Sequence, residues 1–76
     1  MDLRETFAEN LQRIRSQRRI SQEELALKTK MSRSYLSQLE KGVYYASLKI
    51  IGRLAEALDV APAEFLALPP KRSSRR

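Results

Sequence analysis

The fold is decided by residues 21–42, which read SQEELALKTKMSRSYLSQLEKG. Two serines, Ser21 and Ser32, are of the residue type that caps the N-terminus of a helix. Glu24 stands three positions after Ser21, which completes a capping box, and Gly42 is a typical helix stop. The distance between the two serines predicts a helix of about two turns, a tight connection and a second helix.

Helical periodicity continues on both sides of this segment. Before it, apolar residues at helical spacing predict a helix over roughly 3–18, with Arg15 beside the apolar stripe. After it, Ser47 is a suitable N-cap for a fourth helix, and Pro62 suits the first position of a last short one. The apolar residues of these two helices are Leu48, Ile51, Leu54, Ala55 and Leu58, then Phe65, Leu66 and Leu68. No stretch alternates with period two, so the expected class is all-α, a compact five-helix domain over residues 1–68.

The composition excludes most enzyme chemistry. The chain has 76 residues, and its 15 Lys and Arg against 9 Asp and Glu give a net charge of +6. A domain of this size buries only about 60% of the surface that it exposes when unfolded. Without Cys or His it can build no disulfide, no Cys/His metal site and no Ser-His nucleophile. We therefore expect no metal, no cofactor and no catalysis, and we expect association between chains to add stability.

The positive charge is concentrated in the first half of the chain. Residues 13–33 hold seven basic side chains against two acids, a net of +5, whereas residues 40–68 carry three against four, a net of −1. Residues 69–76 open with two prolines and then carry four basic residues, a composition typical of a disordered tail. This tail is either a solubilising end or an arm that binds phosphate without sequence preference.

The chain shows no signal for a membrane. No apolar run approaches the about 18 to 20 residues that span a bilayer. The N-terminus is mixed in charge and is followed by no apolar signal core. We expect no membrane association and a cytoplasmic location, which zero Cys permits without requiring it.

Three stretches together resemble one known family. They are Ser21 to Ala26, Met31 to Gly42, and Ser47-Leu48 leading into the run from Leu54 to Val60. In this order they resemble the helix-turn-helix family of lambdoid phage repressors and Cro, also called XRE-type, over about residues 8–68. The run Arg33-Ser34-Tyr35-Leu36-Ser37 is also similar to the small controller proteins of restriction–modification systems. The resemblance implies a lambda-repressor-like domain whose recognition helix spans residues 32–41.

The polar face of that helix carries the candidate base contacts. From polarity alone it reads as an ordinary solvated surface. The resemblance implies instead that it reads bases in the major groove, through Arg33, Ser34, Ser37 and Gln38. Arg33 can donate two hydrogen bonds to guanine O6 and N7, and Gln38 can pair with adenine N6 and N7.

Other residues are candidates for contacts with the DNA backbone. The resemblance implies a phosphate contact for Gln22, which is otherwise simply a good helix former at the start of its helix. Tyr35 can either bind a phosphate or pack against the preceding helix. The remaining candidates are Lys28, Lys30 and Lys41. Lys30 also stands where the family usually has glycine, which predicts a strained or differently shaped turn.

Arg15 and Glu40 are expected to have a structural role. In the family the matching residues form a partly buried ion pair that ties the first helix to the recognition helix. The resemblance therefore implies an ion pair between Arg15 and Glu40 here. Neither residue is expected to read bases.

The apolar residues late in the chain predict a dimer. They exceed what one small core can hide, so part of the set is expected to form a two-fold interface, and about half to join the core with Phe65. The candidates are Tyr44, Tyr45, Val60, Leu66 and Leu68. A dimer would read two half-sites roughly 10 to 10.5 base pairs apart on a pseudo-palindrome.

These inferences lead to one main hypothesis and one alternative. The main hypothesis is a sequence-specific, nucleoid-associated transcriptional regulator, most simply a repressor, that occupies an operator on double-stranded DNA as a homodimer. The alternative is an antitoxin-like or adaptor module that uses the same fold to hold a partner protein. Loss of specific DNA binding on Arg33→Ala would favour the first.

Overall fold

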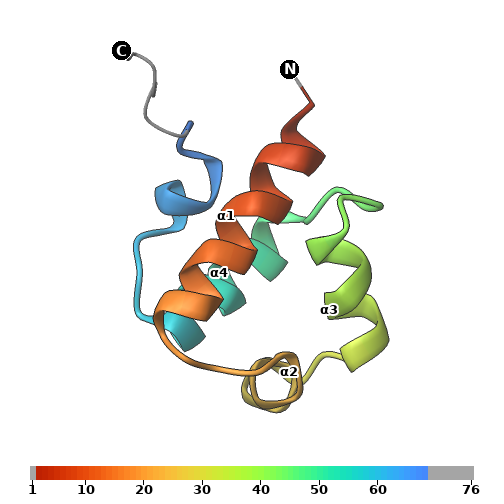
Figure 1. Cartoon of the computed structure of the whole chain (residues 1–76), viewed down its shortest axis with the longest axis vertical. Helices are drawn as coiled ribbons and strands as arrows, with labels where there is room; N and C mark the ends of the chain where they lie inside the picture. The colour runs from red at the N-terminus through yellow and green to blue at the C-terminus, as the bar shows by residue number, and fades with distance from the viewer. Residues whose placement is uncertain (1, 69–76) are drawn as a thin grey trace.

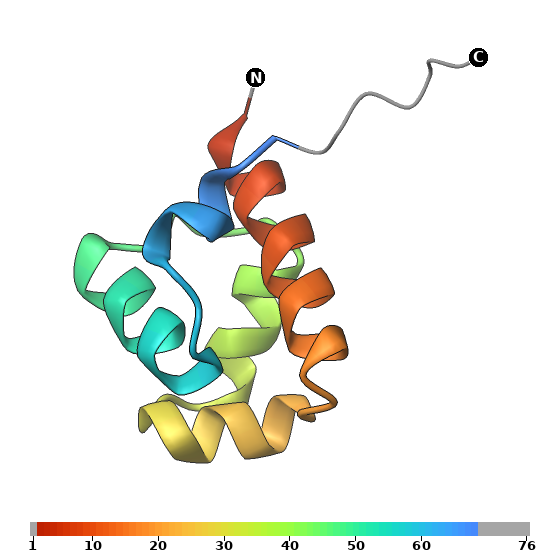
Figure 2. The same cartoon turned by 90° about the vertical axis from the view of Figure 1, so that its left-hand side faces the viewer.

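Four α-helices and a final 3-10 helix surround one apolar core in the computed structural model, which describes residues 2–68. The elements are α1 (Leu3–Gln17), α2 (Gln22–Thr29), α3 (Arg33–Glu40), α4 (Leu48–Leu58) and η1 (Pro62–Leu66). Helix α1 packs against α3 and η1, and α2 packs against α3 and α4 (Figure 1). Figure 2 shows α2 lying across one end of the bundle, away from the N-terminus of α1. The all-α class is confirmed, and the described residues contain no strand.

The helix starts are where local chemistry predicts them. Ser21 Oγ accepts from Glu24 N at 3.0 Å, and the Glu24 side chain accepts from Ser21 N at 3.4 Å, so the capping box is present. Ser32 and Ser47 cap α3 and α4 in the same way. Asp2 caps α1, and the side-chain hydrogen bond from Arg4, with its backbone N–H, holds the pKa of the Asp2 carboxyl below its usual range.

In the described part of the chain, each of the four α-helices is followed closely by a residue in the left-handed conformation. Only one of these four residues is glycine. Gly42 has φ +76°, whereas Arg19, Lys30 and Asp59 have φ of +57°, +60° and +57°. In each case the next residue donates back to a carbonyl five positions earlier, as from Met31 N to Ala26 O at 3.0 Å. A non-glycine residue in this conformation costs about 1–2 kcal/mol. The expected strain at Lys30 is confirmed.

The core explains how the last segment is held. Phe65 is fully buried, and its ring lies 5.5 Å from that of Phe7 on α1. Asn10 is buried beside them, and its Nδ2 donates to Phe65 O and Ala67 O, both at 2.8 Å. Its Oδ1 accepts from Arg13, so every polar atom of this buried amide has a partner.

Two expectations about the second half were wrong, and a third is not tested by the structure. Leu48 was counted with the apolar residues that mark α4, yet it is 85% exposed. It is the first residue of the helix, and a side chain there points back beyond the elements that cover α4. The last helix is a 3-10 helix that ends at Leu66, so Leu68 lies outside it and is exposed. The basic tail predicted over residues 69–76 lies outside the described residues.

Candidate nucleic-acid interface

Helix α3 presents a polar face on a buried support. Leu36 and Leu39 are fully buried, and they lie three residues apart on the side that meets α1 and α2. The other side carries the four predicted base contacts. Of these, Arg33 and Ser34 are exposed, and Ser37 and Gln38 are half-buried. Figure 1 shows α3 at the edge of the molecule, with no other helix outside it.

An ion pair fixes the end of α3. Arg15 Nε donates to Glu40 Oε2 at 2.6 Å, and Arg15 Nη2 donates to Glu40 Oε1 at 3.0 Å. A third donor, Arg15 Nη1, reaches Ile20 O at 2.9 Å in the connection between α1 and α2. The Glu40 side chain is only 4% exposed and that of Arg15 is 19% exposed. One guanidinium therefore ties α1, the start of α2 and α3 together.

Two glutamines complete this cluster. Gln22 Nε2 donates to Glu40 Oε1 at 2.9 Å, and Gln12 Nε2 donates to the Glu40 backbone oxygen at 2.6 Å. The family resemblance implies a phosphate contact for Gln22, and in this structure the nitrogen of its side-chain amide is engaged by Glu40. Its backbone N–H, at the first position of α2, precedes the first intrahelical hydrogen bond and stays available for an anion. Gln12 was not anticipated, since no motif marks it.

Tyr35 takes part in packing. Its ring is half-buried against the core and stacks on Tyr44 in the loop after α3, with centroids 5.8 Å apart and planes inclined by 25°. Tyr44, a predicted dimer contact, thus packs against α3 from its C-terminal side. Lys41 follows α3 directly as its C-cap and is exposed.

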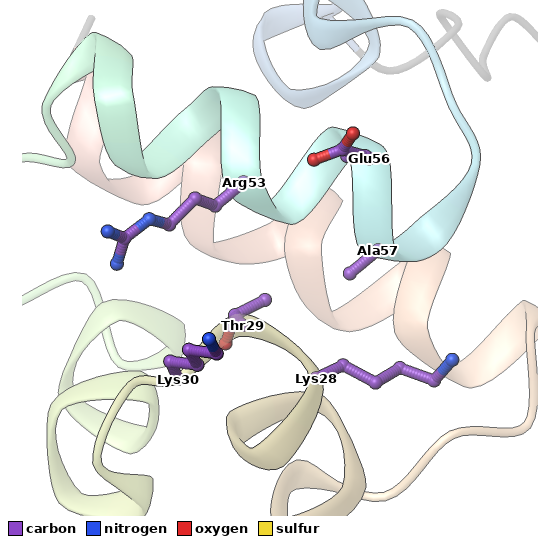
Figure 3. Close-up of a pocket in the computed structure, with 6 residues that line it drawn as sticks. All are labelled: Lys28, Thr29, Lys30, Arg53, Glu56 and Ala57. Atoms are coloured by element: carbon purple, nitrogen blue, oxygen red, sulfur yellow. The ribbon is translucent and has the colours of Figure 1, made fainter.

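The other two predicted phosphate contacts lie in a hollow between α2 and α4, which we call the basic hollow. It is lined by Lys28, Thr29, Lys30, Arg53, Glu56 and Ala57 (Figure 3). Arg53 extends from α4 towards the side of the molecule on which α3 lies, above Lys30, whereas Lys28 extends to the opposite side. Arg53 was not among the predicted site residues, because only the packing of α2 against α4 brings it near Lys30.

A second hollow is apolar. It encloses about 200 Å³ between α1, the loop before α4, and η1, and we call it the apolar hollow. Its lining residues are Leu3, Arg4, Phe7, Tyr45, Ala46, Leu48, Ile51 and Leu66. Tyr45 and Leu66 of the predicted dimer set lie here, and Leu3 and Leu48 join them as exposed apolar side chains. Val60, by contrast, packs against the core.

No helix in the described part of the chain is long and apolar enough to cross a membrane. Within the same residues, no group of three or more His, Cys, Asp or Glu could hold a metal ion.

Comparison with known proteins places this geometry in a family. The helix-turn-helix family model matches residues 11–65. The chain is 35% identical to control protein C.BamHI of Bacillus amyloliquefaciens, over 86% of this chain and 82% of that one. The crystal structure of hypothetical transcription factor NHTF from Neisseria superposes with a TM-score of 0.83 at 38% identity, covering 92% of this chain and 79% of that chain. The restriction–modification controller protein C.AhdI from Aeromonas hydrophila gives 0.78 at 37% identity, covering 82% and 94%. The chain therefore belongs to the XRE-type helix-turn-helix family of DNA-binding transcriptional regulators.

Proposed function

We propose that this regulator recognises a pseudo-palindromic operator as a homodimer, most simply to repress, with α3 in the major groove. The observation that carries the proposal is the polar face of α3, which is held by two buried leucines and a partly buried ion pair. A helix of this kind fits the major groove with its N-terminal residues towards the base edges. Arg33 and Ser34 lie at the N-terminal end of α3, and they are the more exposed of the four polar residues on this face.

Contacts to phosphate hold the helix in register. We assign these to the backbone N–H of Gln22 at the start of α2, to the Tyr35 hydroxyl and to Lys41 at the end of α3. Lys28 is left out of this set because its side chain extends away from the side on which α3 lies (Figure 3). Such a protein works on the bacterial nucleoid, in the cytoplasm.

Arg33 provides the test of base reading. We expect Arg33→Ala to weaken binding to an operator selected from a random DNA pool by about 1–3 kcal/mol, roughly 5- to 150-fold, for each half-site. Arg33→Lys keeps the charge but loses the planar guanidinium that can donate two hydrogen bonds to one base. It should therefore lose most of the preference for the operator over other DNA, while the salt dependence of binding stays the same. Competition binding against scrambled DNA, at several salt concentrations, measures both quantities. Unchanged operator preference in both variants would contradict the assignment and favour the adaptor alternative.

We assign the dimer contact to the apolar surface around the apolar hollow, made by Leu3, Tyr45, Leu48 and Leu66. Arg4 lies over the Tyr45 ring at 4.9 Å and frames this surface. A contiguous exposed apolar patch is typical of a protein interface, and a two-fold axis would pair the patch with its own copy. Two copies would present two recognition helices to the two half-sites.

A charge on this surface should break the dimer. We expect Leu48→Glu to give monomers in analytical ultracentrifugation and to leave the fold intact, because Leu48 is 85% exposed. Operator occupancy should fall with it, since one half-site supplies too few contacts. Leu27→Glu is the matched control, because Leu27 is 79% exposed on α2 and does not line the apolar hollow. A Leu48→Glu variant that remains dimeric would refute this surface.

A further inference from the structure

The basic hollow holds positive charge that its one acidic residue does not neutralise. Lys28, Lys30 and Arg53 line it with Glu56. Among the described residues the ion pairs are those of Arg4 with Asp2 and Arg15 with Glu40, so none of these three cations has a carboxylate partner. Three unpaired cations within one hollow form an attractive site for an anion.

The direction of the side chains divides this set. Arg53 extends towards the side on which α3 lies, and Lys30 stands below it at the end of α2 (Figure 3). Lys49 is exposed one helical turn before Arg53, and residues four apart share a helix face. Lys28 extends the other way. Lys30 and Arg53 therefore lie on the side of the basic hollow nearer α3, and Lys49 shares the helix face of Arg53.

The position of Lys30 adds a second observation. It holds a left-handed conformation that glycine would adopt without strain, only three residues before α3 begins. Arg19 and Asp59 share this conformation, so strain alone does not assign a role. Lys30 differs from both because its side chain lines the basic hollow beside Arg53.

We propose that Lys30, Arg53 and Lys49 form a phosphate-binding flank that contacts the backbone of the duplex read by α3. This inference rests on the proposed function and extends the interface from α2 and α3 onto α4. Phosphate contacts carry no sequence information themselves, but they set register and affinity. The carboxylate of Glu56 lines the same hollow and repels a phosphate, so it limits how tightly the flank binds DNA.

The test is the salt dependence of operator affinity in single variants. Each lost phosphate contact reduces the magnitude of the slope of log affinity against log salt by about 0.9. A substitution removes one contact from each half of the dimer, so the slope changes by about 1.8 and the loss of affinity between 50 and 200 mM salt shrinks roughly twelvefold. We expect this change for Arg53→Ala and for Lys30→Gly. Lys30→Gly should also raise the melting temperature, because it removes strain together with charge. Glu56→Gln should tighten binding.

Lys28→Ala is the matched control, because it removes one charge from the same hollow on the side away from α3. It should leave the slope unchanged. If Arg53→Ala and Lys30→Gly keep the wild-type slope while Arg33→Ala loses operator preference, the flank is refuted and the proposed function stands. If Lys28→Ala lowers the slope as much as the other two, the effect is one of total charge and the flank is also refuted. If the wild-type chain selects no DNA sequence, both proposals fail.

Discussion

Glu40→Ala is expected to lower the free energy of unfolding by about 3–5 kcal/mol, because it leaves the Arg15 guanidinium partly buried and unpaired. The carboxylate accepts two hydrogen bonds from Arg15 and one from Gln22, so no other residue in the cluster can replace it. A carboxylate at the C-terminal end of a helix is also opposed by the helix dipole, which makes this position depend on its cationic partner. Urea denaturation followed by circular dichroism measures the loss.

The exposed pair Asp2–Arg4 provides the control for this prediction. It has a comparable distance, 2.9 Å, but its side chains are 33% and 37% exposed. Arg4→Ala should therefore lower the free energy of unfolding far less than Glu40→Ala does, because water screens the pair. Since Glu40→Ala could leave the domain largely unfolded, Gln22→Ala provides a milder variant that removes one bond of the cluster and should cost about 1 kcal/mol. Equal costs for Glu40→Ala and Arg4→Ala would show that the ion pair does not support α3.

Phe65→Ala is expected to lower the free energy of unfolding by about 3–5 kcal/mol. Phe65 is fully buried against Phe7, and its backbone oxygen accepts from Asn10, so the ring and the main chain together hold η1 on α1. Removing the ring leaves a cavity that η1, with its three-residue turns, cannot easily fill.

An exposed leucine gives the reference for the cost of truncation. Leu27→Ala on α2 should change stability by no more than about 0.5 kcal/mol, because its side chain is already in water. The same urea titration at several protein concentrations separates the effect of Phe65→Ala on the monomer from any effect on a dimer. If Phe65→Ala lowered the free energy of unfolding as little as Leu27→Ala does, η1 would not be part of the cooperatively folded domain.

Sequence patterns predicted the features that depend on neighbours in the chain. Ser21, Ser32 and Ser47 cap their helices because a side-chain oxygen needs only the N–H three residues later. The ion pair of Arg15 with Glu40 joins residues 25 apart, and it was reached only through the family resemblance. The role of Asn10, whose partners lie 55 and 57 residues away, carried no local signal at all.

The same distinction applies to the candidate interface. The alternation of Leu36 and Leu39 with polar residues determines by itself that α3 has one buried and one polar face, because the helical repeat is set by the backbone. The tertiary structure decides which polar groups near that face remain free, because it brings the amide of Gln22 on α2 to Glu40 on α3. It also decides that Lys30 meets Arg53 and that Leu48 borders an apolar hollow. Helix periodicity and caps act over a few residues, whereas these contacts depend on how α2 and η1 pack against α4.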